Sequence, residues 1–526
     1  MLASRRKRWV FMLTTLVLLI ASVSLFFLKV VPVKMLPFDN KNEFQVVIDM
    51  PETATLEETA AVTKEIAAFV STQDEVLNCQ TYVGTSAPIS FNGLMRHYDL
   101  RKGEKVADIQ VNLTDKGDRS AQSHDIAKKM RKPIQEIAKR WGANAKVVEV
   151  PPGPPVLSTI VAEIYGPDYQ EQIRVARQIK AIFDQTEGMV DTDVFIEDDQ
   201  KEIRFDVDKE KAMLRGVAPA KITENLRAAV SGKNVGVLHK ENTLSPIPIQ
   251  LELNNADKFS VEALKSLPVQ NMQGQVVPLG DVTQVKEVIK EKSIWRKDQK
   301  RVVMVAADLA GSLESPIYAM MDVNKKLEEI KLPSGYDLTV LNSSQPETED
   351  NYSMKWDGEW QITYEVFRDL GIAFAVALII IYLLIVGWFQ SFMVPIVMLT
   401  AIPLSLIGIV VGHWVMGAYF SATSMIGFIA LAGVMVRNSV LLIDFIDIRL
   451  KEGIPLTEAV IEAGAVRTLP IVLTPGTVVL GAIVILFDPL FQGLAISLMG
   501  GTITSTVLTL VVVPLLYYKM LRNKIK

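Results

Sequence analysis

The residues of this 526-residue chain that could do chemistry are polar side chains inside an otherwise apolar stretch. Arg437 and Asn438 are the strongly polar residues between Met425 and Ile443, a run typical of a membrane span. A charged side chain near the middle of a spanning helix costs roughly 2.5–3.5 kcal/mol, so it requires a partner. Asp444 follows Arg437 by two helical turns and shares its face. The pattern predicts an intramembrane cation that needs a carboxylate.

Other polar residues in or near apolar segments leave alternatives open. Asp444 is either an acid that serves Arg437 or a helix-end residue that reaches the cytoplasmic interface. Thr474 either hydrogen-bonds a backbone carbonyl of its own helix or faces the same polar position as Arg437. Arg467 is expected at the membrane interface. His413 is expected to be a satisfied helix-end residue rather than a proton carrier.

The composition and the soluble motifs argue against catalysis and resident metals. Cys79 is the single cysteine, which excludes an intramolecular disulfide or a cysteine-based metal cluster. The four histidines stand at scattered positions, and the soluble part has no nucleotide-binding, zinc-protease or serine-hydrolase motif. The carboxylate-rich run 195–211 is explained by a solvated strand and turn. The net charge of −4 gives no sign of a nucleic-acid partner. From the missing motifs, the single cysteine and the scattered histidines we expect no cofactor, no metal site and no enzyme activity.

Six apolar segments predict six membrane spans. The first, Trp9 to Val31, follows the basic cluster Arg5–Arg8, and its length of about 22 residues favours a retained anchor over a signal peptide. The other five lie at about 369–389, 392–415, 421–446, 468–487 and 494–518.

Basic residues predict the topology of these spans. Both termini and the connection 447–467 are expected in the cytoplasm because of the basic residues Arg5 to Arg8, Arg449, Lys451, Arg467, Lys519, Arg522, Lys524 and Lys526. The large region between the first two spans is therefore expected on the outer side. Trp356 and Trp360 are expected in an interfacial aromatic belt.

The soluble region contains a repeated strand–helix–strand pattern. Similar segments begin at Phe44 and Thr159, each with an alternating strand, a turn containing proline and a helical pattern. Two further copies have helices near 121–140 and 316–330. Four βαβ units predict two ferredoxin-like pairs, separated by the proline-rich segment 151–155.

The predicted fold is an α-helical membrane bundle of six spans plus an outer α+β part of four ferredoxin-like βαβ units with an insertion. The predicted boundaries are 1–31 for the first span, 32–150 for the first soluble subdomain, 151–200 and 291–345 for the second, 201–290 for the insertion and 346–526 for the five-helix membrane region.

Four long motifs resemble those of the resistance–nodulation–division (RND) efflux permeases. They are SFMVPIVMLTAIPLSLIG (391–408), SMIGFIALAGVMVRNSVLLIDFI (424–446), EGIPLTEAVIEAGAVRTLPIVLT (452–474) and MGGTITSTVLTLVVVPLLY (499–517). The resemblance extends to the first span and the paired βαβ region, but it covers only the second half of such a permease. It implies two porter subdomains around a substrate cleft, with the insertion as a docking subdomain.

The resemblance also assigns a proton relay. The family's second half has a lysine and an asparagine where this chain has Arg437 and Asn438, a following acid at Asp444, and an arginine and a threonine at Arg467 and Thr474. The counterpart in the family is a pair of adjacent aspartates in the first half, and none of the spans here has two adjacent acids. Because arginine does not deprotonate, Arg437 is expected to act as a fixed countercharge. The sequence RTLP also carries one arginine where the family has two.

The implied protein is a proton antiporter of the bacterial inner membrane, with its large domain in the periplasm and both termini in the cytoplasm. The implied partners are a first-half RND subunit or a fused N-terminal half, a periplasmic adaptor and an outer-membrane channel, in a trimeric assembly. Protons and a small molecule are the expected substrates. The absence of a methionine or histidine cluster favours amphiphilic compounds, as in multidrug resistance, over heavy metals.

Two alternatives come from other functional classes. A Sec-type protein-export accessory subunit also has six spans and a large loop after the first, but four soluble repeats argue against it. A membrane-anchored scaffold with a vestigial relay would lose an unneeded intramembrane charge easily, so the retained Arg437, Asn438 and Thr474 argue mildly against it.

Overall fold

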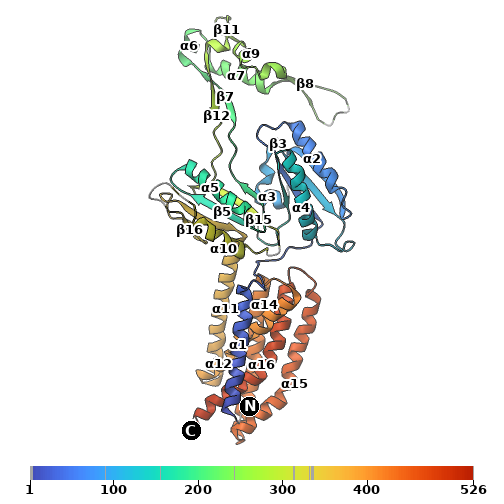
Figure 1. Cartoon of the computed structure of the whole chain (residues 1–526), viewed down its shortest axis with the longest axis vertical. Coiled ribbons are helices and arrows are strands. Elements are labelled where there is room, and N and C mark those ends of the chain that lie inside the picture. The colour runs from blue at the N-terminus through green and yellow to red at the C-terminus, as the bar shows by residue number, and fades with distance from the viewer. Residues whose placement is uncertain are drawn as a thin grey trace. The chain divides into compact units, whose positions relative to one another are not determined.

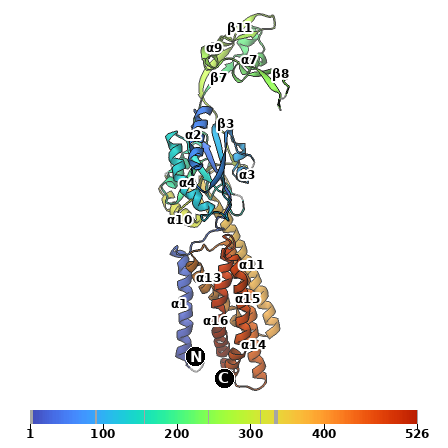
Figure 2. The same ribbon diagram turned by 90° about the vertical axis from the view of Figure 1, so that its right-hand side faces the viewer.

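The computed structural model describes residues 4–88, 91–154, 156–241, 243, 245–311, 314–330, 332 and 337–524. Pro155 of the proline-rich segment and Lys526 of the C-terminal basic group lie outside these residues. The chain forms two compact units, Met1–Ile196 with Ile294–Lys526 and Glu197–Ser293. The first unit contains a bundle of long helices and two sheets with helices on them (Figure 1, Figure 2).

The membrane region has, among the described residues, six segments long and apolar enough to cross a bilayer, as predicted. They are α1 (Arg5–Phe27), α11 (Glu359–Phe389), α12 (Met393–Leu399) with α13 (Ala401–Met416), α14 (Ala422–Lys451), α15 (Leu456–Ile485) and α16 (Gln492–Lys524). The third segment divides into α12 and α13 because Pro403 lacks an amide hydrogen and cannot donate to the carbonyl of Leu399.

The predicted connection 447–467 is largely helical, since α14 and α15 extend into it and residues 452–455 join them. The guanidinium of Arg449 stabilises this tight turn through two acids, Glu452 at 2.7 Å and Glu462. Both helices therefore continue past the apolar segments with polar ends. As a result, Arg467 lies within α15 rather than in a connection.

Small residues let α13, α14 and α16 form the core of the bundle. A Cβ atom at Gly408 of α13 would lie 2.1 Å from the carbonyl oxygen of Gly500 on α16. A Cβ atom at Gly427 of α14 would lie 2.8 Å from the Cβ of Ser497, also on α16. These close approaches explain why glycine occupies the contacts. In contrast, α1, α11 and α15 carry many exposed apolar side chains around this core.

The first sheet has the strand order β2-β3-β1-β4, with antiparallel neighbours and helices α2 and α4 packed on it. Its elements are β1 (Glu43–Asp49), α2 (Leu56–Val70), β2 (Val76–Thr85), α3 (Phe91–Arg96), β3 (Lys102–Leu113), α4 (Ser123–Arg140) and β4 (Asn144–Val148). A capping box of Thr55 and Glu58 begins α2. Along β1, Phe44, Val46 and Ile48 face the helices, which leaves the alternate residues on the opposite face.

The second sheet has the order β16-β17-β5-β15-β6, with α5 and α10 in its core. Its elements are β5 (Ile160–Tyr165), α5 (Tyr169–Asp184), β6 (Met189–Val194), the short pair β13 (Arg296–Lys297) and β14 (Lys300–Arg301), β15 (Val303–Leu309), α10 (Pro316–Leu327), β16 (Thr339–Leu341) and β17 (Ser353–Gly358). Trp356 of β17 is fully buried, stacks near Phe183 and donates to Asn324 at 2.9 Å. The prediction of an interfacial Trp356 is therefore wrong, because this strand belongs to the sheet.

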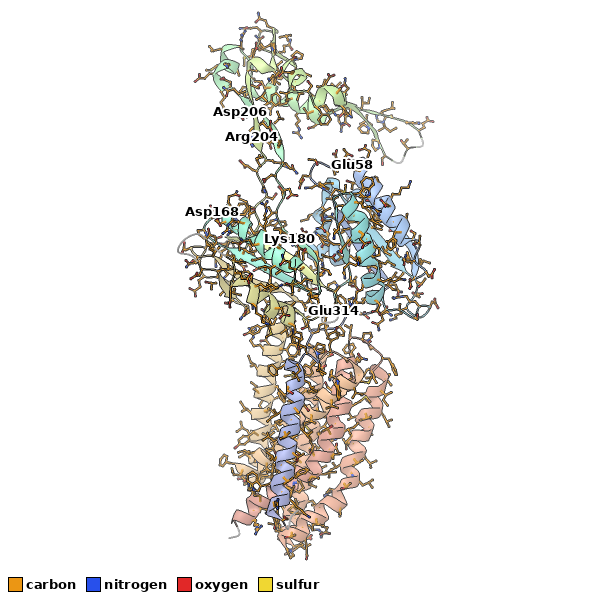
Figure 3. All side chains as sticks on the ribbon, viewed as in Figure 1. Glu58, Asp168, Lys180, Arg204, Asp206 and Glu314 are labelled. Atoms are coloured by element: carbon orange, nitrogen blue, oxygen red, sulfur yellow. The ribbon has the colours of Figure 1, made fainter. Side chains whose placement is uncertain are left out.

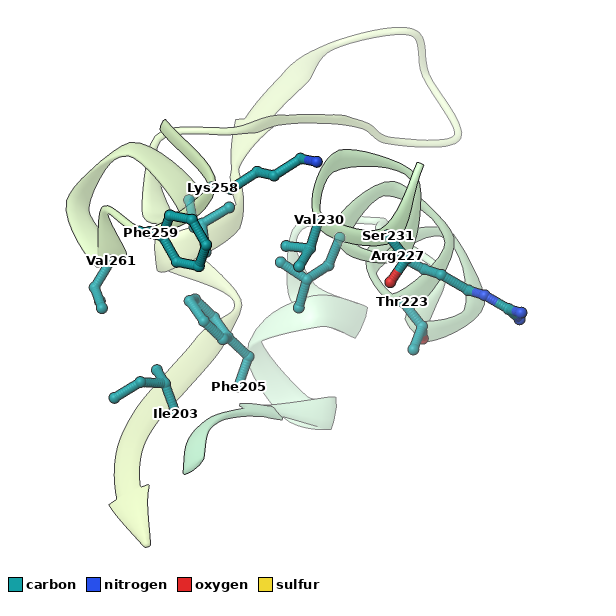
Figure 4. Close-up of a pocket in the computed structure, with 11 residues that line it drawn as sticks. Ile203, Phe205, Thr223, Arg227, Val230, Ser231, Lys258, Phe259 and Val261 are labelled. Atoms are coloured by element: carbon teal, nitrogen blue, oxygen red, sulfur yellow. The ribbon is translucent and has the colours of Figure 1, made fainter. Parts of the chain in front are cut away.

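The second unit is a small α+β body. Its elements are β7 (Lys201–Val207), α6 (Lys209–Leu214), α7 (Pro219–Ser231), β8 (Lys233–Leu238), β9 (Ile247–Leu251), α8 (Asn255–Lys258), α9 (Val261–Lys265), β10 (Pro268–Gln270), β11 (Val276–Pro278) and β12 (Thr283–Ile289). β7 and β12 pair along their whole length, and the hydroxyl of Ser293 donates to Glu197 at 2.7 Å. A pocket of about 450 Å³ in this unit is lined mainly by apolar residues, including Phe205, Val230 and Phe259 (Figure 4).

Candidate functional site

Arg437 lies at the middle of α14 on a face that the bundle leaves exposed. At a rise of 1.5 Å per residue, about 21 Å of helix separates it from either end of α14. Other exposed residues continue this face along the helix: Ile426, Ala430, Gly433, Leu441 and Ile448. Within the described part of the chain, Arg437 has no hydrogen-bond or ion-pair partner. The cation is thus central in its helix, exposed, and without a partner among the described residues.

Asn438 points the other way, into the bundle. Its side chain is buried, and its Oδ1 atom has no hydrogen-bond partner among the described residues. At the start of α14, away from Asn438, the ring nitrogens of His413 contact the carbonyl oxygen of Ile409 and the hydroxyl of Ser424, both at 2.8 Å. His413 is therefore satisfied in place, whereas Asn438 retains an unused acceptor next to Arg437.

Arg467 and Thr474 lie on α15, beside α14. The guanidinium of Arg467 stands over the ring of Phe445 with 4.9 Å to the ring centre, a cation–π contact. The Thr474 hydroxyl donates to the carbonyl of Pro470 at 3.3 Å, which is the local backbone bond that the sequence allowed. Pro470 and Pro475 both interrupt the hydrogen bonding of this helix.

Asp444 is half-buried on α14, and none of the described residues pairs with it. The acid that does find a partner is Asp447, which accepts a hydrogen bond from the Tyr517 hydroxyl of α16. Sequence reasoning missed Asp447, although its spacing of three residues from Asp444 places it on a neighbouring face. Among the described residues, no hydrogen bond or ion pair joins the five predicted relay residues to one another. The five residues lie on the two adjacent helices α14 and α15 but do not form a connected hydrogen-bond network among the described residues.

A second group of charges joins the subdomains of the two sheets. Arg96, at the end of α3, pairs with Asp308 of β15 at 2.8 Å. Arg131 of α4 pairs with Asp191 of β6 at 3.0 Å, and Lys146 of β4 pairs with Asp193 of β6. Both arginine side chains and Lys146 are almost completely buried. These ion pairs cross from one sheet to the other, so separating the sheets requires breaking buried charge pairs.

Asp308 is the most strongly held of these acids. Burial by itself would raise the pKa of its carboxyl group, but Arg96 and hydrogen bonds from Ser158 and the amide of Thr159 hold that pKa well below the usual range. The carboxylate is therefore ionised at any physiological pH. Among the residues that the structure describes, no group of three or more His, Cys, Asp or Glu side chains is placed to hold a metal ion.

The long apolar helices and the two helix-packed sheets define a multi-pass membrane protein with a cation in its membrane region. The chain belongs to the AcrB/AcrD/AcrF family, whose model matches residues 3–521. The resemblance to RND permeases is thereby confirmed. Members of this family are transporters rather than enzymes.

Several characterised proteins are similar in sequence. The swarming motility protein SwrC of Bacillus subtilis is 27% identical over 363 residues, which cover 67% of this chain and 32% of SwrC. The cobalt-zinc-cadmium resistance protein CzcA of Cupriavidus metallidurans is 25% identical over 372 residues, 69% of this chain and 33% of CzcA. The nickel and cobalt resistance protein CnrA of the same organism is 26% identical over 381 residues, 70% of this chain and 34% of CnrA.

Solved structures agree on the fold. Two crystal forms of a heavy metal efflux pump superpose with TM-scores of 0.76 and 0.77 at 20% identity, covering 98% of this chain and 50% of the pump. The chain therefore spans half of that structure, and its alignments span about a third of its curated relatives.

Proposed function

We propose that this chain is the second half of a proton-driven RND export permease and works with a first half that carries adjacent intramembrane aspartates. The observation that carries the proposal is Arg437 at the middle of α14, which is exposed and has no partner among the residues that the structure describes. A lone cation exposed to hydrocarbon is costly. A carboxylate pair on a neighbouring helix would remove that cost and would occupy the exposed face of α14.

In this proposal, proton binding alters the pull on Arg437. When the aspartates of the first half are ionised they attract the guanidinium, and when they are protonated that attraction falls. Arg437 keeps its charge throughout, because arginine is not deprotonated in proteins. Asn438, Thr474, Asp444 and Arg467 would supply hydrogen bonds and charge along the same route.

The other parts take roles from the same proposal. The four βαβ units would form two porter subdomains, with the substrate path between their sheets. The insertion at 201–290 would be the docking subdomain, meeting neighbouring subunits, a periplasmic adaptor and an outer-membrane channel in a trimeric assembly. The large domain would lie in the periplasm with both termini in the cytoplasm.

For the substrate, the relatives favour metal cations over the amphiphilic compounds that the sequence suggested. CzcA and CnrA are named for resistance to cobalt, zinc, cadmium and nickel. The space between the two sheets is lined by carboxylates that lysine and arginine now neutralise. Aspartate oxygens freed by separation of the sheets would be ligands for a divalent cation. The Sec-type alternative is not favoured, because the permease family model covers almost the whole chain.

Reconstitution tests this function. The chain and its first-half partner are placed together in liposomes, an acid-inside pH gradient is imposed, and uptake of Co²⁺, Zn²⁺ or Cd²⁺ is followed beside that of a fluorescent amphiphile. We expect metal uptake coupled to proton release from the liposomes, and loss of both with Arg437→Ala. Uptake of the amphiphile alone would overturn the substrate class. Wild-type complexes that move neither protons nor substrate would overturn the function itself.

A further inference from the structure

Glu314 is a buried acid on which three cations converge. The carboxylate lies two residues before α10, and its side chain is 5% exposed. It pairs with Lys34, which follows α1, at 3.5 Å, and with His124 and Lys128 of α4 at 2.8 and 2.6 Å. Figure 3 labels Glu314 between the helical bundle and the sheets. One acid therefore connects the exit of the first span with the subdomains of both sheets.

His124 extends this connection. Its Nε2 contacts Glu314 at 2.8 Å, and its Nδ1 contacts Glu149, just beyond β4, at 2.9 Å. The imidazole also stacks on Phe38 with 4.3 Å between ring centres. Burial alone would lower the pKa of His124, but its hydrogen bonds to the carboxylates of Glu149 and Glu314 raise that pKa to about 9. The ring therefore donates from both nitrogens as a cation at neutral pH.

The segment 31–38, here called the strap, is fixed to the start of α14. The Lys34 amide donates to the carbonyl of Phe420 at 3.2 Å, and the Phe420 amide donates to the carbonyl of Pro32 at 2.9 Å. The amide of Ala422, the first residue of α14, donates to the carbonyl of Met35 at 2.9 Å. The backbone of the strap is thus hydrogen-bonded to the start of the helix that carries Arg437.

The strap and the end of α1 are also fixed to the start of α10. The Ser315 hydroxyl donates to the carbonyl of Val33, and the Tyr318 hydroxyl donates to the carbonyl of Phe26 at 3.0 Å. Lys34 is almost completely buried, with its ammonium over the ring of Phe38 at 4.3 Å. If the strap moved away from Glu314, the buried Lys34 would lose this ion pair, which is unfavourable, while Glu314 would keep His124 and Lys128.

We propose that Glu314 is the positioning residue that couples movement of α14, through the strap, to the relative movement of the two sheets. This inference rests on the proposed function, in which proton binding changes the attraction on Arg437, and it takes a shift of α14 as the result of that change. The three cations of Glu314 come from the strap and from α4, and Glu314 itself precedes α10. A shift at the start of α14 can therefore reach the subdomains of both sheets through this carboxylate.

The first test separates proton movement from substrate movement. In liposomes holding the chain and its first-half partner, Glu314→Gln is expected to reduce substrate uptake at least tenfold while proton flux persists, so that more protons cross per substrate. Glu314→Asp, which keeps the charge, should restore part of the coupling.

Asp322→Asn is the matched control: Asp322 of α10 pairs with Lys29 at 3.4 Å, and both side chains are well exposed. Its loss should change uptake less than twofold. Unchanged coupling in Glu314→Gln, or a parallel loss of proton flux and uptake, would overturn the proposal.

The second test does not depend on transport. Spin labels at the exposed positions Lys129 of α4 and Met321 of α10, in a Cys79→Ser background of the full chain, report the separation of the two subdomains. We expect one narrow distance distribution in the otherwise wild-type chain and a broad or longer one with Glu314→Gln. An unaltered distribution would overturn the role of Glu314. A wild-type complex without transport but with the expected distributions would overturn the proposed function alone.

Discussion

Replacing Arg437 with leucine is expected to have opposite effects on two measurable quantities. In α14 alone, the substitution removes a charge from the middle of a spanning helix. Membrane insertion of that segment should improve by about 2.5–3.5 kcal/mol, the cost of a central arginine on insertion scales. In the complex with a first half, the same substitution removes the countercharge of the aspartate pair. Association should then weaken by up to about the same free energy.

The expected magnitude follows from the position and exposure of Arg437. It is central in α14, without a partner among the described residues, so association would relieve most of the insertion penalty. Because each 1.4 kcal/mol is a factor of ten, the dissociation constant of the two halves should rise roughly 10²-fold. The assay is a titration of a fluorescent first half against this chain in lipid nanodiscs, beside an insertion assay of the isolated α14 segment.

Two variants serve as controls for Arg437→Leu. Arg437→Lys keeps the charge and should bind within a fewfold of wild type. Leu441→Ala lies on the same exposed face and removes only apolar contact, which contributes little in lipid, so it should change the dissociation constant by less than about threefold. Equal binding of wild type and Arg437→Leu would refute the idea that Arg437 is compensated by the other half. Poorer insertion of the leucine segment would refute the premise that the charge faces hydrocarbon.

Three further predictions concern the fold and its pH dependence. His124 has a pKa raised from 6.5 to about 9, so the stability it contributes is complete below pH 6.5 and is lost as the pH rises through about 9; His124→Gln should flatten this decline in a pH series of thermal denaturation. Glu163→Gln would remove the carboxylate charge that Lys297 shares with the fully buried Lys355, 3.3 Å away, and would leave Lys355 with Asp357 at 3.7 Å and Gln361 at 2.6 Å. We expect the free energy of unfolding of the soluble region to fall by about 1.5–3 kcal/mol, measured by denaturant titration, and an unchanged midpoint would contradict this. Gly408→Ala should loosen α13 from α16 by about 1–3 kcal/mol and lower the melting temperature of the bundle. The control Gly371→Ala places its Cβ in open space on α11 and should leave the melting temperature unchanged.

The membrane part could be predicted largely from the sequence, because apolar length is itself the physical requirement for crossing a bilayer. The helix ends could not, since Arg449 and its two acids continue the helical structure beyond the apolar run where hydropathy gives no signal. Trp356 was misplaced for a related reason. An aromatic residue close to a span fits an interfacial belt by composition, and only strand pairing with β5 shows that it lies in a sheet.

The relay residues could be named from their types, but their surroundings could not. Adjacent positions on a helix face different directions, so Arg437 and Asn438 differ in burial although they are neighbours in sequence. The charges between the sheets could not be found at all, because Arg96 and Asp308 are far apart in the chain and each resembles an ordinary surface residue. Glu314 likewise gives no local sign of its three cations.

The way the chain enters and leaves the second unit has an evolutionary consequence. β7 and β12 run side by side, and Glu197 and Ser293 at the two ends are joined by a hydrogen bond. The whole unit is thus an insertion whose first and last residues lie next to each other. Its interior is a separate hydrophobic cluster, so it can accumulate substitutions without disturbing the cores of the two sheets. The sequence of the second unit can therefore diverge faster than those of the membrane helices and the strap, whose residues contact one another.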